Sequence, residues 1–478
     1  MDSRYSAQRA VVPIATLLLA ALGDAGCAVG PRYHRPQVAI PQAFAEANAD
    51  TYDATRPPAS TLWHAFNDPV LDRLIDGAIS HNKTLAVAIA QLNEARALRG
   101  LEAFALLPTV TAGGNRTTSR PSKLDPLVPA SVGKTTTFKA GFDASWEIDL
   151  FGAARNARRA VRANEAAASA GLEAAQRAII AEVAQTYFSF RSEQERLRVA
   201  QRNVANLEES QKLLEARQEA GRGSELDTAR ARSLLYATEA RLPQTEAALV
   251  RDEQRLAVLT AQPIDALRTV LGPAHPLRVL PALVASGDPQ QWFRRRPDVQ
   301  QAEQRLIAAT AEVGVDAADF FPQLTLLGGF GWTSQAARDI GTSTARRWNY
   351  GPSLTWSFLD VGRVRQRVLA AKARAVGAVA NYEDTVLRAL EDTENAFAGY
   401  RAANRSVVML GQAADSARSA ATLAQDRFDA GAADTLVVLD AERTQLDLED
   451  QYATAASQRT TALAALYKAL AGDFATGP

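Results

Sequence analysis

Two stretches of the chain, 210 positions apart, each change from a two-residue to a helical periodicity near a glycine. In the first stretch every second residue is apolar: Phe138, Ala140, Phe142, Ala144, Trp146, Ile148 and Leu150. Such alternation is typical of a strand with one apolar and one polar face. After Gly152 the sequence becomes rich in Ala and charged residues, which predicts a long helix that follows the strand without a loop. The same pattern recurs from Trp348 to Gly362.

The two halves of the chain align with each other, and from Trp146 to Ala261 they do so without a gap. The equivalent residues at this offset are Tyr187 and Phe397, Phe190 and Tyr400, Arg191 and Arg401, Arg217 and Arg427, and Gly221 and Gly431. The chain is therefore predicted to be a tandem duplication of a unit made of helices, a β-hairpin and a long helical pair. Each helix of about 68 residues would be roughly 100 Å long.

Turn and helix-capping residues set the expected boundaries. Gly221 and Gly431 predict the C-terminal caps of the long helices, and Ser224 predicts an N-cap. Pro243 should kink or interrupt the returning helix. The predicted segments are a signal peptide (1–26), an extended N-terminal linker (27–61), repeat 1 (62–261, with hairpin 109–150 and helical pair 152–260), a connector (262–290), repeat 2 (291–472, with hairpin 322–360 and helical pair 362–470) and a tail (473–478).

The N-terminus has the pattern of an export signal. Arg4 and Arg9 precede an apolar run over 10–22, which is too short to span a bilayer. Small residues then precede Cys27, the only cysteine of the chain. This pattern predicts lipidation at Cys27, and simple secretory cleavage nearby is the alternative. One acyl group anchors weakly, so a lipid here would supplement another membrane attachment.

Composition argues against several other classes of function. Lys and Arg together number 53, as do Asp and Glu, so the chain has no excess of positive charge that would favour binding to a nucleic acid. The four histidines are scattered, and a single cysteine excludes CxxC metal and redox sites. We expect no metal, no cofactor and no enzyme activity, because no nucleophile, base and acid can be assembled from these residues.

The two-faced strands point to a membrane. Four strands per chain are too few to close a barrel, and an open sheet edge cannot lie in lipid. Several chains must therefore share one barrel, with Phe142, Trp146 and Trp356 toward the outer-membrane lipid. Lys139 and Asp143 would line a wet lumen, and the helices would extend the barrel as a tube. A soluble β-sandwich with one buried face is the alternative fold.

Five motifs resemble those of the outer-membrane factors of tripartite efflux pumps, most closely the lipoprotein branch that serves resistance–nodulation–division pumps. They are Cys27–Pro36, Phe66–Leu71, Trp146–Gly152, Arg295–Glu303 and Phe321–Leu324. The resemblance implies a mixed α and β membrane protein, a homotrimer that shares a 12-stranded transmembrane β-barrel continued by a periplasmic α-helical barrel. It also implies that the chain docks to a periplasmic adaptor and, through it, to an inner-membrane transporter.

The resemblance further implies a gate at the periplasmic tips of the helices, near Gly221 and Gly431. Asp440 falls where the family often has a constricting acid, and Asp227 falls where the family has a latch acid. An ordinary solvated charge is the alternative for Asp440. Arg217 and Arg427 are either part of this gate or hydrogen-bond to helix-end carbonyls.

The expected function is that of a passive outer-membrane duct, lipid-anchored and multidrug-exporting, that hydrolyses nothing itself. A duct for protein secretion or for metal export is one alternative. A periplasmic coiled-coil adaptor or scaffold is another, although an adaptor has no need of four strands with an aromatic face.

Overall fold

The computed structural model describes residues 28–47, 52–53, 68–122, 133–274, 284–285 and 289–470. The signal peptide, Cys27 and the predicted tail lie outside these ranges. The elements in chain order are β1 (Tyr52–Asp53), α2 (Pro69–His81), α3 (Lys83–Phe104), β2 (Thr109–Ser119), β3 (Thr135–Ile148), α4 (Ala153–Glu219), α5 (Glu225–Glu239), α6 (Leu242–Thr260), α7 (Ile264–Leu271), β4 (Val284–Ala285), α8 (Pro289–Arg295), α9 (Pro297–Ala318), β5 (Gln323–Ser334), η2 (Ala337–Asp339), β6 (Arg346–Thr355), η3 (Phe358–Asp360), α10 (Val361–Asp429) and α11 (Thr435–Ala469).

The chain divides into two compact units, and each unit draws on both sequence repeats. Unit 1 comprises 1–36, 92–168 and 301–382, and unit 2 comprises 37–91, 169–300 and 383–478. Within the ranges that the structure describes, no helix has an apolar stretch long enough to cross a membrane.

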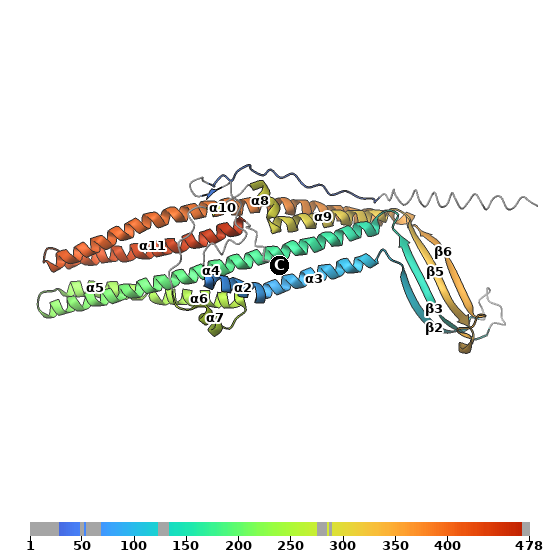
Figure 1. The fold of residues 1–478 in the computed structure, drawn as a ribbon, viewed down its shortest axis with the longest axis horizontal. Helices are drawn as coiled ribbons and strands as arrows, with labels where there is room; N and C mark the ends of the chain where they lie inside the picture. Colours follow the sequence, from blue (N-terminus) through green and yellow to red (C-terminus); the bar gives the residue numbers. More distant parts are fainter. Residues whose placement is uncertain are drawn as a thin grey trace, which may run out of the picture. The chain divides into compact units, whose positions relative to one another are not determined.

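Unit 1 contains both hairpins, joined in one four-stranded antiparallel sheet of order β2-β3-β5-β6 (Figure 1). The register places Phe142 opposite Ala112 on one side and Phe330 on the other, so apolar residues of neighbouring strands share a face. The first hairpin is connected to the second only through β3 and β5, which leaves β2 and β6 at the edges.

A short connection separates strand from helix in both repeats, so the prediction of a helix that follows the strand without a loop is wrong. Strand β3 ends at Ile148, and residues 149–152 turn the chain before α4. The Asp149 carboxylate accepts from the backbone N–H and from Nε of Arg155, at 2.9 and 3.1 Å. It thereby satisfies a donor that every helix start leaves free. In repeat 2, η3 lies between β6 and α10.

Unit 2 contains the far ends of the two long helices, and each ends in the same glycine cap. The backbone of Gly221 has φ 73°, and that of Gly431 has φ 72°. The N–H of Arg222 donates to the Arg217 carbonyl at 2.8 Å, and the N–H of Ala432 donates to the Arg427 carbonyl at 2.7 Å. This bond to the residue five positions back is typical of a Schellman motif, which needs a left-handed residue such as glycine. Both glycines are therefore C-terminal caps of the long helices, as the sequence predicted.

The returning helices differ between the repeats. Pro243 occupies the first turn of α6, and α5 ends at Glu239, so the first returning helix is interrupted where the proline predicted. The second returning helix, α11, runs unbroken over Thr435–Ala469. The connector predicted over 262–290 also contains a helix, α7, whose Leu267 and Leu271 are buried.

The core of unit 2 follows the predicted helical seam. On α4, Val183, Phe190, Leu197 and Val204 follow the seven-residue spacing of a coiled coil; Leu197 is half-buried and the other three are buried. Phe44, in the extended segment before α2, belongs to this core: its ring contacts those of Trp292 and Phe397 at 5.5 and 5.1 Å between centroids.

Candidate functional site

One face of the sheet in unit 1 is apolar and solvent-exposed. Trp348 is 68% exposed and Tyr350 is 81% exposed, although both are large apolar residues of a well-formed strand. The exposed apolar residues of this face also include Val110, Phe142, Trp146, Leu326, Phe330 and Leu354. An apolar patch of this extent marks contact with another apolar phase or partner.

In each repeat, a tryptophan lies on this face at the end of the sheet nearest the helices. The indole Nε1 of Trp146 donates to the carbonyl of Leu106 at 3.0 Å. The equivalent Trp356 donates to the carbonyl of Phe320 at 3.2 Å. Each indole thus has an apolar ring on the exposed face and a satisfied polar atom at its edge, as tryptophans have at membrane–water interfaces.

The opposite face of the sheet is polar. Lys139, Asp143 and Asn349 lie on it, and Arg347 approaches Asp143 to 4.0 Å. A sheet that is apolar on one side and charged on the other fits a boundary between lipid and water.

The two helical turns of unit 2 pack against each other through apolar side chains. The shared cluster comprises Leu214, Ala231, Ala424, Phe428, Val438 and Leu439. The guanidinium of Arg217 lies over the ring of Phe428, 4.1 Å from its centroid. A cation–π contact therefore joins the tip of repeat 1 to the tip of repeat 2.

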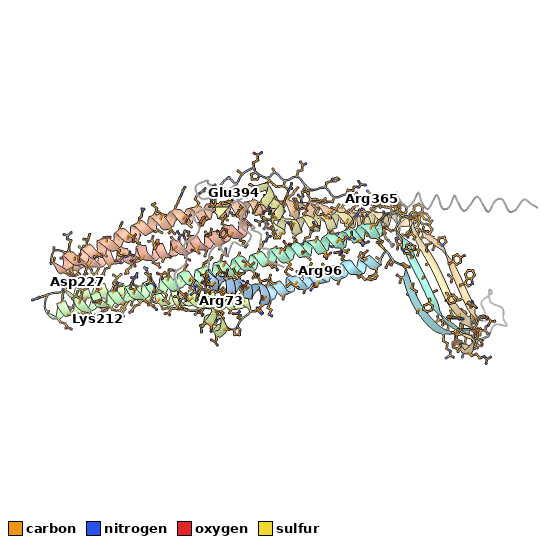
Figure 2. All side chains as sticks on the ribbon, in the orientation of Figure 1. Arg73, Arg96, Lys212, Asp227, Arg365 and Glu394 are labelled. Carbon is orange, nitrogen blue, oxygen red and sulfur yellow. The ribbon has the colours of Figure 1, made fainter. Side chains whose placement is uncertain are left out.

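The predicted gate residues take different places at these tips. Asp227 lies near the turn between α4 and α5 (Figure 2), where its backbone N–H donates to the Ser224 hydroxyl and its carboxylate accepts from that hydroxyl at 3.0 Å. Arg427 is exposed, whereas Arg217 stacks on Phe428. Asp440 is exposed on the second turn of α11. The role of these residues in a gate stays a prediction.

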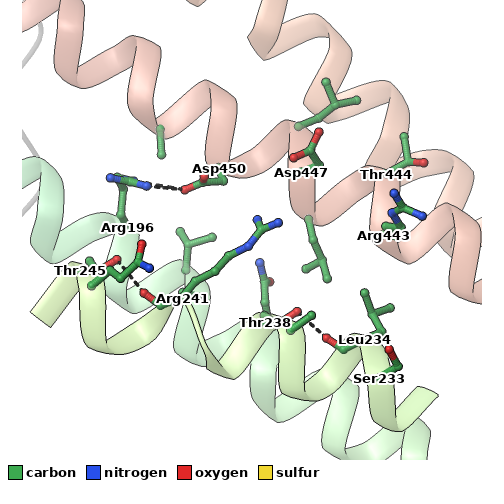
Figure 3. Close-up of a pocket in the computed structure, with 18 of the residues that line it drawn as sticks. Arg196, Ser233, Leu234, Thr238, Arg241, Thr245, Arg443, Thr444, Asp447 and Asp450 are labelled. Carbon is green, nitrogen blue, oxygen red and sulfur yellow. Dashed lines mark hydrogen bonds and ion pairs between the residues drawn. The ribbon is translucent and has the colours of Figure 1, made fainter. Parts of the chain in front are cut away.

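Asp440 borders a cavity of about 1440 Å³ that the sequence did not predict. Helices α4, α5 and α6 form one wall, and α11 forms the other (Figure 3). Its charged lining residues are Arg196, Arg230, Arg241, Arg251, Arg443, Glu193, Asp440, Asp447 and Asp450. Arg196 pairs with Asp450 at 3.0 Å across the two walls. These five arginines and four acids nearly cancel, so the cavity has no strong field of either sign.

A second feature that sequence reasoning missed is a buried carboxylate between the helical pairs. Glu449 is 5% exposed. Its Oε1 accepts from Arg418 at 3.1 Å, and its Oε2 lies 3.6 Å from Arg202. Glu442, seven positions earlier on α11, accepts from the Ser210 hydroxyl at 3.2 Å. The seven-residue spacing of two acids was the available signal, because it places both on one helical face.

Burial raises the pKa of the Glu442 carboxyl, and the hydrogen bond from Ser210 opposes this shift. Because the folded pKa is raised, stability should fall as pH rises from about 4, the value for an unfolded Glu, through the folded pKa. We expect the Glu442→Gln variant to unfold at a higher temperature than the parent protein at pH 8. This difference in unfolding temperature should shrink toward pH 5. Asp447→Asn, an exposed carboxylate on the same helix, is the control. A pH-independent difference would contradict this account.

The comparisons with known proteins agree with this geometry. The sequence profile described as "Outer membrane efflux protein" matches residues 74–262 and 289–472. The chain is 30% identical to "Outer membrane protein OprJ" of Pseudomonas aeruginosa over 96% of each chain. It is 33% identical to "Pyoverdine export outer membrane protein OpmQ" of Pseudomonas putida, over 87% of this chain and 89% of the relative. The solved structure of the outer-membrane channel OprN is 38% identical, with a TM-score of 0.90 over 94% of this chain and 100% of that one.

The chain belongs to the outer membrane efflux protein family. It is an outer-membrane efflux channel protein, and the predicted fold class, mixed α and β with the two hairpins as four strands of one sheet, is confirmed. In the described ranges, no three His, Cys, Asp or Glu side chains are grouped so that they could hold a metal ion.

Proposed function

We propose that three copies of this chain form a passive duct that carries small molecules across the outer membrane. The observation that carries this proposal is the four-stranded sheet, whose edge strands β2 and β6 each pair with a strand on one side only within the described chain. Open edges cannot lie in lipid, and single-chain barrels in the outer membrane need at least eight strands. Three chains supply twelve strands.

The direction of the strands supports closure between chains. Strand β2 leads away from α3 and β6 leads back to α10, so β6 of one chain and β2 of the next would pair antiparallel. The strands are 10 to 14 residues long, which suffices to span the hydrocarbon layer at a tilt. The polar face with Lys139 and Asp143 then lines the lumen.

The position of Ala28, the residue after Cys27, supports lipidation of that cysteine. A Cβ on Gly152 would lie 2.7 Å from Cα of Ala28, so Ala28 lies at the junction between strand and helix. Trp146 indicates that this junction lies at the periplasmic surface of the outer membrane. A lipid on Cys27 would therefore enter the inner leaflet beside the barrel.

The tips are the proposed docking site for a periplasmic adaptor, which connects the duct to an inner-membrane transporter of the resistance–nodulation–division type. Leu226 and Leu436 occupy equivalent positions and are 57% and 52% exposed. Leu213 and Leu423 repeat the same pairing about two turns before each cap. These exposed leucines offer apolar contacts to a helical partner. The transporter would supply the energy, and the duct itself would catalyse no reaction.

The test is the mass of the full chain purified from outer membranes in detergent. We expect a trimer whose subunits begin at Cys27 and carry acyl chains, and which conducts ions in planar bilayers. A monomer would overturn the shared barrel, and a trimer without acyl chains would overturn only the lipidation.

Asp440 should influence conduction if the tips form the constriction. Three Asp440 carboxylates around a narrow opening would attract cations. We expect Asp440→Ala to lower the cation selectivity of single channels and to weaken block by multivalent cations several-fold. Asp447→Ala, two turns further along α11, is the matched control. Unchanged selectivity in Asp440→Ala would remove this residue from the gate.

A further inference from the structure

The charges on the lipid-facing side of the sheet lie at one end only. Arg116 pairs with Phe138 across β2 and β3, and Arg346 pairs with Trp332 across β6 and β5. Both arginines are exposed and share the face of the exposed aromatic residues. The Arg116 guanidinium lies over the Phe138 ring, 5.6 Å from its centroid. This end of the sheet, where β2 ends and β3 begins, lies away from the long helices (Figure 1).

Further cations flank these two arginines. They are Arg120 and Lys134 beside the first hairpin loop and Arg338 in the second, and all three are exposed. We call these five residues (Arg116, Arg120, Lys134, Arg338 and Arg346) the outer basic rim. Asp339, the acid described in this region, pairs with Arg338 at 3.8 Å. In the part of the chain that the structure describes, no carboxylate pairs with Arg116 or Arg346.

The other end of the same face has no charge. Its lipid-facing residues are Val110, Ala112, Ala144, Trp146, Ile148, Leu324, Leu326, Pro352, Leu354 and Trp356. A cation on the lipid face of a barrel costs about 2–4 kcal/mol at the bilayer midplane and almost nothing at the interface. The cost of burying charge therefore allows the basic rim at this end of the sheet. It does not explain why nearly all the charges there are positive.

Closing the barrel brings the two strand arginines together. Because β6 of one chain would adjoin β2 of the next, Arg346 and Arg116 of neighbouring chains would lie on adjacent strands. Adjacent strands are about 5 Å apart. In a register that sets them side by side, the two guanidinium groups would repel each other unless an anion lay between them, and a phosphate accepts two such donors well.

We propose that the outer basic rim binds the phosphate groups of the outer-leaflet glycolipid, with one site at each subunit interface. The chemistry that favours this occupant is a lipid-facing cation pair beside aromatic rings, at the level of the headgroups of the outer leaflet. The aromatic rings would contact acyl chains while the guanidinium groups hold the phosphates. This inference rests on the proposed trimeric barrel.

The test is native mass spectrometry of the full-length trimer, delipidated in detergent with a chelator present, to which lipid A with two phosphates or fully dephosphorylated lipid A is added. We expect the phosphorylated form to bind about tenfold more tightly or better. The double variant Arg116→Gln, Arg346→Gln should lose that preference, and Arg116→Lys, Arg346→Lys should keep most of it. Arg347→Gln, next in sequence but on the luminal face, is the matched control and should bind as the parent does.

Equal binding of the two lipids by the parent protein would overturn the proposal without any variant. Retained preference in the double Gln variant would overturn it as well. The mass and the single-channel conductance of the same samples report on the trimer separately. A conducting trimer without phosphate preference would contradict the lipid site alone, whereas a monomer would contradict the proposed function.

Discussion

Arg191→Ala should lower the free energy of unfolding by about 3–5 kcal/mol, the largest effect we expect from a single side chain of unit 2. Arg191 is 2% exposed. Its guanidinium donates to the carbonyls of Leu271 and Pro273 at 2.5 and 3.2 Å, and to Oε1 of Gln194 at 2.8 Å. Alanine would leave these acceptors buried without a donor, and an unsatisfied buried group costs about 1–3 kcal/mol.

The same side chain links three elements. Its Nε donates to the Tyr187 hydroxyl at 3.2 Å, and that hydroxyl donates to Asp68 at 2.7 Å. Asp68 in turn caps α2 by accepting from the N–H of Val70. Removing Arg191 should therefore weaken the attachment of α2 and of the end of α7 to α4.

Arg401 is the internal control, because the duplication places it at the equivalent position of repeat 2. Its side chain is 28% exposed and binds the carbonyl and the carboxylate of Glu46. Water can replace these partners, so Arg401→Ala should cost about 1 kcal/mol or less. The measurement is the temperature at which purified trimers lose their tryptophan fluorescence signal. If the two variants lost the same amount of stability, the burial of Arg191 would not account for its contribution.

These two arginines show how far the sequence could predict the structure. The offset of 210 correctly identified Arg191 and Arg401 as equivalent, and periodicity located the hairpins and the long helices. It could not show that Arg191 would hold α7 while Arg401 would hold the N-terminal segment. Those partners come from other parts of the chain, and periodicity reports only which face of a helix is buried.

The candidate site was predictable to a similar degree. Gly221, Gly431, Ser224 and Pro243 act through local backbone conformation, and the structure places all four as local rules predict. The cavity beside Asp440 and the burial of Glu449 depend on the packing of α11 against helices of repeat 1. The contact of Arg217 with Phe428 also crosses between the repeats. The sequence near these residues can show which side chains share a helical face, but not which helix of the other repeat they contact.

The turn at Gly152 shows where equivalence between the repeats fails. Gly152 has φ 86° and ends the connection before α4, whereas Gly362 is already within α10. The offset suggested one role for both. The surroundings differ as well, because a Cβ on Gly152 would meet Ala28, whereas one on Gly362 would meet no atom within 4 Å.

Gly331→Ala is expected to reduce the amount of trimer in the outer membrane sharply, which would be the largest effect of a single substitution in unit 1. Gly331 lies opposite Gly141 in the pair of β3 and β5 that joins the two hairpins. A Cβ on Gly331 would clash with the Ala140 carbonyl oxygen, and one on Gly141 would lie 2.5 Å from the Phe330 carbonyl oxygen. Because both obstacles are backbone atoms, the strands themselves must move apart.

Forcing a methyl group into such a contact costs about 1–3 kcal/mol, and the cost arises three times in a trimer. Gly351→Ala is the matched control, since a Cβ at Gly351 on β6 meets no atom within 4 Å. We expect that variant to assemble and conduct as the parent does. The readouts are the yield of trimer from outer membranes and its dissociation temperature. If Gly331→Ala assembled as well as Gly351→Ala, the close pairing of β3 with β5 would not be what joins the two hairpins of each chain into one sheet.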